Sequence, residues 1–200
     1  NGALCNAVTG RTDSQALLEQ LFTANIFLTS LDDRGQWYRY HQLFSDLLRD
    51  RLDKLPKNET AELHLRACNW YTGSGMISEA IQHALAAVDY TTAVRLIESH
   101  AMDMLMEWHV KTVDGWMRAI PTEWVAQSPK ANLAFAWLRL TQRDFERAMP
   151  YLRRAEALFA NPQTDGGDLS LQAKWLAIQA MLMNAQGNPS ESLRLATRAL

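Results

Sequence analysis

The sequence predicts a mainly α-helical protein in which a small α+β unit with a β-hairpin precedes an array of paired helices. Over residues 1–54, patterns typical of helices and of strands alternate. After Pro56, apolar residues recur only at helical spacing, and two later segments repeat one layout of helix, tight turn and helix. We therefore place a boundary near residues 54–58 and expect two domains, residues 1–54 and 55–200.

The composition is typical of a folded protein with a sizeable core. The chain has 200 residues, of which 48% are hydrophobic, and a formal net charge of -2. A chain of this size buries roughly 70% of its unfolded surface, so disordered and collagen-like classes are excluded. With 20 Lys and Arg against 22 Asp and Glu, no overall basic field favours nucleic acid.

Neither a membrane span nor a signal peptide is predicted. No apolar run approaches the roughly 20 residues that cross a bilayer, and the first five residues lack the basic and apolar regions of a signal. Cys5 and Cys68 form no CxxC motif, so we expect reduced thiols in the core. We expect a soluble, cytoplasmic protein. The missing initiating Met and an apolar pattern that is still running at Leu200 also predict a fragment of a longer chain.

Two helices are expected before the hairpin. A short helix ends at Gly10, and Asp13 or Ser14 can cap a second helix. The apolar face of the second helix is formed by Leu17, Leu18, Leu21 and Phe22.

The hairpin and a third helix complete the first unit. Residues 25–31 and 36–41 are rich in β-branched and aromatic side chains, and turn residues occupy positions 32–35. A helix follows over residues 42–52. Its spacing predicts the burial of Leu43, Phe44, Leu47, Leu48 and Leu52.

Short amphipathic segments follow the boundary. Separate apolar faces are expected at residues 90–97, 102–106 and 110–120. Pro150 lies inside the helix predicted over 145–159, which we expect either to kink there or to begin nearer Met149. The clearest apolar face comes first and consists of Ile77, Ala80, Ile81, Ala84, Leu85 and Val88.

The last part of the chain contains an internal repeat. Residues 133–159 and 171–200 each hold two helices, and Ser128-Pro129 and Asn188-Pro189 provide caps with a following proline. The distance between the two turns exceeds the roughly 34 residues of a tetratricopeptide repeat (TPR), and a loop at 161–167 accounts for the excess. Such helix pairs bury their faces by stacking, which predicts a TPR-like α-α superhelical array.

The usual catalytic and metal-binding motifs are absent. The sequence has no phosphate-binding loop, no GxGxxG after a strand and no HExxH. Glu79 and His83 would supply only two of the three or four ligands that zinc needs. We therefore predict no metal site and no catalytic residue, and interpret the dispersed histidines as surface or packing residues. They are His64, His83, His100 and His109.

Six tryptophans at helical positions allow two interpretations. They fill the core between helices, or they line an aromatic groove for a sugar or a peptide. The register of the helices decides between the two. The residues are Trp70, Trp108, Trp116, Trp124, Trp137 and Trp175.

His41 is the candidate functional residue. It lies where the second strand passes into the helix that begins at Gln42, beside the unpaired amides of a helix N-terminus. Such an environment favours an anion, and the imidazole can donate to a phosphate oxygen. The alternative interpretation is a histidine that caps the helix or bridges hairpin and helix.

Two motifs carry a family resemblance. They are Phe27-Leu28-x-x-Leu31-Asp32-Asp33-Arg34 and Trp37-Tyr38-Arg39-Tyr40-His41-x-Leu43-Phe44-x-Asp46-Leu47-Leu48-Arg49. Together they resemble the winged-helix segment of the MalT-type, large ATP-dependent regulators of the LuxR family, which belong to the STAND class of signalling ATPases. Residues 4–11 and the later helices are also similar to that family, densely over the first 54 residues and more loosely afterwards.

The resemblance implies a fragment that joins a winged-helix-like unit, residues 1–54, to the start of a sensor arm. An ATPase core would precede it and a helix-turn-helix DNA-binding domain would follow, so ATP or ADP would bind in the parent protein and no cofactor in the fragment. In related STAND proteins, the His of a Met-His-Asp motif contacts the β-phosphate of ADP. His41 matches that position, whereas Tyr40 and Gln42 depart from the motif and leave its carboxylate role unassigned.

The resemblance also implies partners. A ligand or regulatory protein on the arm would favour an open, ATP-loaded, self-associating state because it binds that state more tightly. DNA would be contacted only through a domain outside this chain, and no membrane is involved. The alternative is a stand-alone adaptor whose concave helical surface binds a peptide, with residues 1–54 as a cap. An enzyme confined to this chain ranks third.

Overall fold

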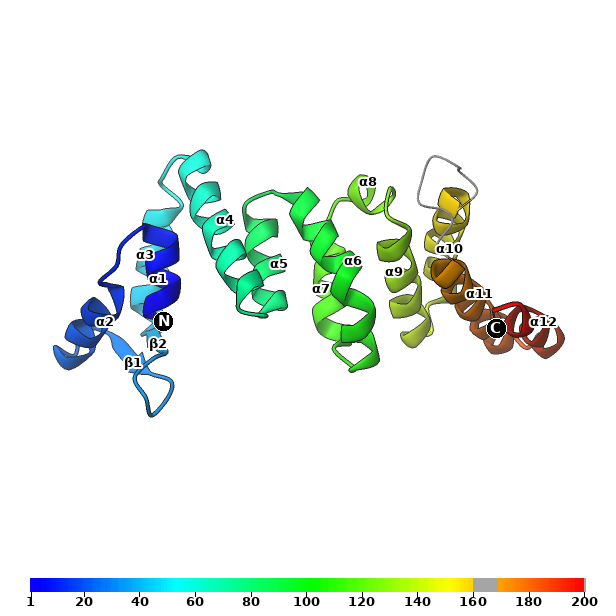
Figure 1. Cartoon of the computed structure of the whole chain (residues 1–200), viewed down its shortest axis with the longest axis horizontal. Coiled ribbons are helices and arrows are strands. Elements are labelled where there is room, and N and C mark those ends of the chain that lie inside the picture. The colour runs from blue at the N-terminus through cyan, green and yellow to red at the C-terminus, as the bar shows by residue number, and fades with distance from the viewer. Residues whose placement is uncertain (160–168, 200) are drawn as a thin grey trace. The chain divides into compact units, whose positions relative to one another are not determined.

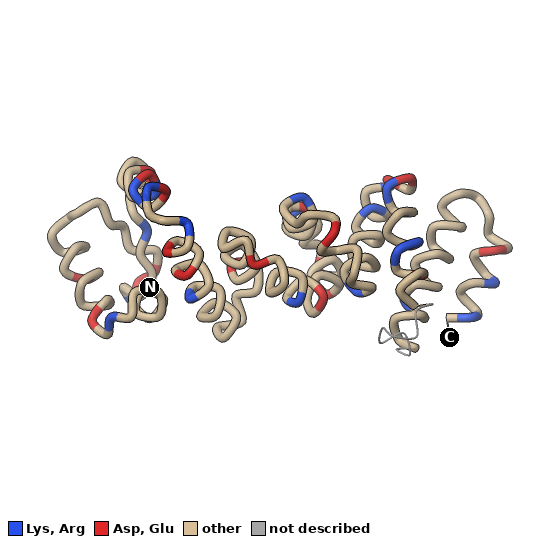
Figure 2. The backbone as a smooth tube through the Cα atoms, turned by 90° about the horizontal axis from the view of Figure 1, so that it is seen from above, with Lys and Arg blue, Asp and Glu red and all other residues tan. Residues whose placement is uncertain are grey.

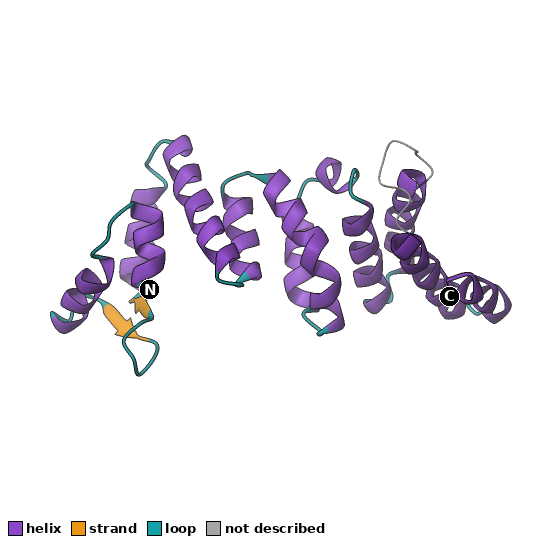
Figure 3. Ribbon diagram, viewed as in Figure 1, coloured by secondary structure: helices purple, strands orange, loops and turns teal. Residues whose placement is uncertain are grey.

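The computed structural model describes residues 1–159 and 169–199. Within these residues the chain forms twelve helices and one two-stranded sheet (Figure 3). This confirms a mainly α-helical protein with a small hairpin near its N-terminus. The loop predicted at 161–167 and the last residue of the final predicted helix, Leu200, lie outside the described residues.

The chain divides into two compact units, Asn1–Asp89 and Tyr90–Leu200, and each is described by itself. The predicted boundary near residues 54–58 falls at the turn before the fourth helix. In the first unit the elements, labelled in Figure 1, are α1 (Gly2–Thr9), α2 (Ser14–Thr23), β1 (Leu28–Ser30), β2 (Tyr38–Tyr40), α3 (Gln42–Leu52), α4 (Lys57–Gly73) and α5 (Ile77–Ala86).

Local hydrogen bonds fix the ends of α1 and α2. The Asn1 side chain accepts from the amides of Ala3 and Leu4, and α1 ends at Gly10, whose φ of 75° suits a residue without a side chain. Asp13 precedes α2 but makes no side-chain cap, because its carboxylate binds Arg11 at 2.8 Å. The predicted side-chain cap of α2 by Asp13 is therefore wrong.

The hairpin is shorter than predicted. Leu28 pairs with Tyr40 and Ser30 with Tyr38, in antiparallel register. Before β1, Asn25 and Phe27 have φ values of 53° and 52°, which is incompatible with an extended strand. The left-handed backbone at these two positions shortens the first strand to three residues.

The predicted burial of the α3 leucines is wrong. No residue of α3 is buried, and Leu43 is 77% and Leu47 48% exposed. The hairpin covers only the side of α3 that carries Phe44, whose ring stacks on Phe27 and tilts against Tyr40. The spacing identified an apolar face correctly, but no described element buries it.

The α4–α5 pair holds the core of the first unit, and Figure 1 shows the two helices side by side. Cys68 is buried, and Cys5 is half-buried. Val88, predicted on the apolar face, is 64% exposed because the chain turns out of the helix there with a φ of 60°. The buried side chains of the pair are Ala67, Cys68, Ala80, Ile81 and Ala84.

The second unit is entirely helical within its described residues. The segments predicted separately at 90–97 and 102–106 form one continuous helix, α6, because no turn residue interrupts them. The elements are α6 (Tyr90–Met106), α7 (Val110–Ala119), α8 (Thr122–Val125), α9 (Pro129–Thr141), α10 (Phe145–Phe159), α11 (Leu169–Ala185) and α12 (Pro189–Ala199).

The predicted helix pairs are α9–α10 and α11–α12. Ser128 accepts from the amide of Ala131 at 2.9 Å, and Asn188 accepts from that of Glu191 at 3.2 Å, so both predicted caps are confirmed. Pro150 lies inside α10, which starts at Phe145; a start nearer Met149 is therefore wrong.

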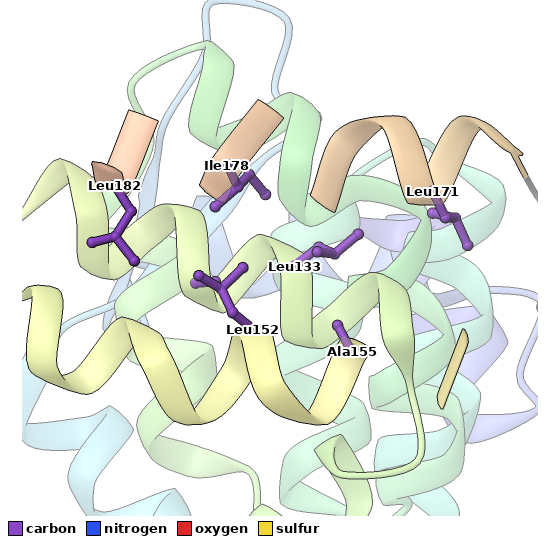
Figure 4. Packing of buried hydrophobic residues seen from close by; sticks show 7 residues of the cluster. Leu133, Leu152, Ala155, Leu171, Ile178 and Leu182 are labelled. Atoms are coloured by element: carbon purple, nitrogen blue, oxygen red, sulfur yellow. The ribbon is translucent and has the colours of Figure 1, made fainter. Parts of the chain in front are cut away.

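The core between α9, α10 and α11 is built from aliphatic side chains. Figure 4 shows leucines of the three helices pointing toward one another. Such a core buries large side chains completely, each worth about 1.5 to 3 kcal/mol. Its members are Leu133, Ala136, Leu152, Ala155, Leu171, Ile178 and Leu182.

Candidate functional site

The backbone of His41 joins the hairpin to α3. Its amide donates to the carbonyl of Phe27 at 2.7 Å, and its carbonyl accepts from the amide of Ser45 at 2.9 Å. His41 is therefore the residue that precedes the first turn of α3, as the sequence predicted.

His41 is exposed at this junction. Its ring makes no hydrogen bond with the residues that the structure describes. It does not cap α3, so the capping interpretation is wrong for the side chain, although the backbone does bridge hairpin and helix. No described side chain accepts from the amides of residues 42–44. The imidazole and the first amides of α3 are thus available to an external acceptor.

Many large apolar side chains of residues 1–56 are exposed. Leu18 is the single buried hydrophobic side chain among residues 1–56. Phe27, which binds the His41 amide through its carbonyl, is 59% exposed. We name the exposed set the apolar face: Leu17, Phe22, Ile26, Phe27, Leu31, Leu43, Leu47, Leu48 and Leu55.

Two histidines that the sequence analysis did not predict to be in contact lie together in the structure. The Nδ1 atoms of His64 on α4 and His83 on α5 lie 2.8 Å apart, and the ring of Tyr71 stacks on His83. Burial lowers the pKa of both imidazoles, and for His83 the neighbouring His64 lowers the pKa further while Glu79 raises it. Burial also raises the pKa of Tyr71. The pair forms because of the register in which α4 packs against α5. No local sequence motif encodes that register.

The other two dispersed histidines have ordinary roles. His100 bonds the carbonyl of Leu96 at 2.9 Å within its own helix, and His109 is exposed, 3.8 Å from Glu107. Within residues 1–159 and 169–199, no group of three or more His, Cys, Asp and Glu could hold a metal ion. None of the described helices is long and apolar enough to cross a bilayer. Basic and acidic residues are interspersed within each unit (Figure 2).

The tryptophans divide between the two interpretations. Trp116 is buried, and the indole of Trp175 donates to the carbonyl of Leu152 at 3.1 Å, so both belong to the core. Trp108 is 82% exposed and is not part of the core. Trp137 packs against the core of α9–α11 and also lines a cavity of about 430 Å³, together with Arg143.

Comparison with known proteins shows what the chain is similar to. Residues 1–62 match the MalT winged helix domain. Over 200 residues the chain is 32% identical to the HTH-type transcriptional regulator MalT of Serratia proteamaculans (strain 568), and it spans 22% of the length of that protein. No solved structure matches the chain significantly. The chain therefore contains a MalT winged-helix domain and is similar over its whole length to a region of a MalT-type transcriptional regulator.

Proposed function

We propose that this chain is the hinge and lever of a signal-responsive, ATP-dependent transcriptional regulator. Residues 1–54 form the winged-helix part of its nucleotide switch, and His41 contacts a phosphate of ADP held in a neighbouring ATPase module. Residues 55–200 form a sensing arm for an inducer or a regulatory protein. DNA is bound by another domain of the regulator.

The apolar face carries this proposal. Residues 1–56 contribute little to the core of the first unit, whose buried side chains lie mostly in α4 and α5. Here Leu18 is the single buried hydrophobic side chain of residues 1–56, while large side chains of α2, the hairpin and α3 remain exposed. Exposed apolar surface of this extent is typical of an interface. The neighbouring module covers the face and thereby brings its nucleotide to His41.

The chemistry of the junction suits a phosphate. The ring of His41 has no described partner, and the first amides of α3 carry the positive end of the helix dipole. The imidazole can donate a hydrogen bond to a phosphate oxygen. The contact exists only while ADP is bound and the two modules are closed.

The switch follows from differential binding. ADP stabilises the closed state through His41, and a ligand that binds the arm more tightly in the open state shifts the population toward opening. Moving a two-state equilibrium from 1:99 to 99:1 takes about 5.5 kcal/mol of such preference. One phosphate contact is a substantial part of that difference, since a hydrogen bond to a charged group is worth about 1.5 to 3 kcal/mol.

The test is the substitution His41→Ala in the full-length regulator. We expect ADP release to accelerate about tenfold or more and transcription without inducer to rise, because the contact is lost. His109→Ala is the matched control, since His109 is also exposed but lies in the second unit. An ADP release rate equal to that of the unaltered regulator would contradict the proposal.

A further inference from the structure

A cavity in the second unit lies where the α9–α10 turn meets the C-terminal part of α11. Its volume is about 430 Å³, within the range of small-molecule sites. The walls are formed by the rings of Trp137 and Phe145 and by the side chains of Leu140 and Met181. We name this cavity the turn pocket.

Arg143 is the single charged residue that lines the turn pocket. Its guanidinium forms no hydrogen bond or ion pair with any residue that the structure describes. The neighbouring acid Asp144 is engaged elsewhere, with Arg147 at 3.4 Å. The hydroxyl of Thr141, the other polar lining group, already donates to the carbonyl of Leu138 at 2.7 Å. The polar side of the turn pocket therefore offers unused donors and a positive charge.

The backbone keeps Arg143 at this place at a cost. The α9–α10 turn and the α11–α12 turn use the same hydrogen bonds, from Arg143 to Leu140 and from Gly187 to Asn184. Gly187 has a φ of 79° and Arg143 one of 58°. Glycine adopts this left-handed conformation freely, whereas other residues pay about 1 to 2 kcal/mol. Val88 and Trp108 adopt the same conformation in the turns after α5 and α6, so this strain belongs to the type of turn and fixes only where Arg143 lies.

We propose that the turn pocket binds a small organic carboxylate with an aromatic or branched aliphatic body. The body lies between Trp137, Phe145 and Met181, and the carboxylate accepts two parallel hydrogen bonds from Arg143. The uncompensated guanidinium selects the charge of the ligand, and the apolar walls select its body. This inference specifies the ligand of the sensing arm and rests on that part of the proposed function.

Another hollow of the second unit lacks these properties. Between α10, α11 and α12, Arg194 and Glu191 both line the surface and bind each other at 2.8 Å. Arg198 lines this hollow too, but so does Glu156, and a carboxylate there would meet two acidic side chains. Charge complementarity therefore favours the turn pocket.

The experiment compares an anionic acid with the neutral alcohol of the same carbon skeleton. Phenylpropionate and phenylpropanol are titrated into the full chain by isothermal calorimetry. We expect the acid to bind about tenfold more tightly or better, because the hydrogen bonds to Arg143 are charge-assisted. Arg143→Gln should remove this preference, and Arg143→Lys should retain part of it. Ala185→Leu, which fills the pocket, should weaken both probes.

A matched control is Arg153→Gln, because Arg153 is an exposed arginine of α10 that does not line the pocket. Equal affinity for the two probes overturns the inference, as does an equal loss in Arg153→Gln and Arg143→Gln. Lack of saturable binding of the acid in the millimolar range overturns it as well. None of these results changes ADP release in His41→Ala, so failure of the pocket and failure of the switch are distinguishable.

Discussion

His64 and His83 join α4 to α5 through a single hydrogen bond between their Nδ1 atoms, 2.8 Å apart. One ring must donate and the other must accept, so at most one facing nitrogen carries a proton. Tyr71, stacked on His83, and the nearby carboxylate of Glu79 complete the surroundings of the pair. The core of the first unit therefore contains a contact that acid disrupts.

The stability of the first unit should fall in mild acid. Burial lowers the pKa of both imidazoles in the folded chain, so the unfolded chain takes up protons first as the pH falls below the ordinary value of 6.5. The stabilisation is complete above that pH and is lost as the pH falls through the folded-state values. Each group contributes at most about 1.4 kcal/mol per pH unit. Urea unfolding at about pH 7.5 and about pH 5.5 measures the loss.

The variant His64→Gln separates this pair from general acid effects. It removes one of the titrating groups and should reduce the difference between the two unfolding midpoints. His109→Gln alters an exposed histidine of the second unit and should leave the difference unchanged. An unaltered pH dependence in His64→Gln would show that the pair is not its source.

Val88→Gly should stabilise the chain by about 1 kcal/mol. Val88 is 64% exposed, so little packing is lost, while its φ of 60° strains a β-branched residue. The matched control is Ala86→Gly, at the last residue of α5, where glycine should destabilise by about 0.5 to 1 kcal/mol. Thermal unfolding measures both, and the prediction fails if the two changes have the same sign.

The double variant Leu43→Gln/Leu47→Gln should accelerate ADP release by the full-length regulator without lowering the stability of this chain. Both side chains are exposed on α3, so the free energy of unfolding of the chain should change by less than about 0.5 kcal/mol. In the full-length regulator the pair should weaken the closed state and accelerate ADP release. Leu193→Gln, on α12 and 70% exposed, is the control. Normal ADP release in the double variant would argue against docking through the apolar face.

Asn132→Leu should destabilise the second unit by about 1 to 3 kcal/mol. Asn132 is fully buried, and its Nδ2 donates to the carbonyls of Val125 at 2.8 Å and Ser128 at 2.7 Å. Leucine has a similar volume but leaves both carbonyls without that donor. Ser128→Ala removes only the cap of α9 and should cost about 1 kcal/mol. Chemical denaturation that ranks the two variants in the opposite order would refute this account.

Sequence patterns predicted the elements with local signals. Gly10, Ser128 with Pro129, and Asn188 act within one turn of their own helix, so the bounds they predict are confirmed. Pro150 was harder, because a single missing amide was tolerated inside α10.

The features that depend on other elements could not be predicted. Apolar spacing marks the face of α3 whether or not anything covers it, so Leu43 and Leu47 looked buried. The His64–His83 pair and the turn pocket arise from the register of neighbouring helices. The position of His41 before α3 was local and is confirmed, whereas its contact with phosphate stays a prediction.

The bond from the His41 amide to the Phe27 carbonyl ties two exposed rings to one backbone link. In the proposed switch, a module that contacts the phenyl ring also lies beside the imidazole, because the two residues share that link. In the proposed switch, docking and the phosphate contact are therefore coupled at this junction. Substitutions of Phe27 and His41 should therefore be non-additive. The double variant should accelerate ADP release little more than either single variant does.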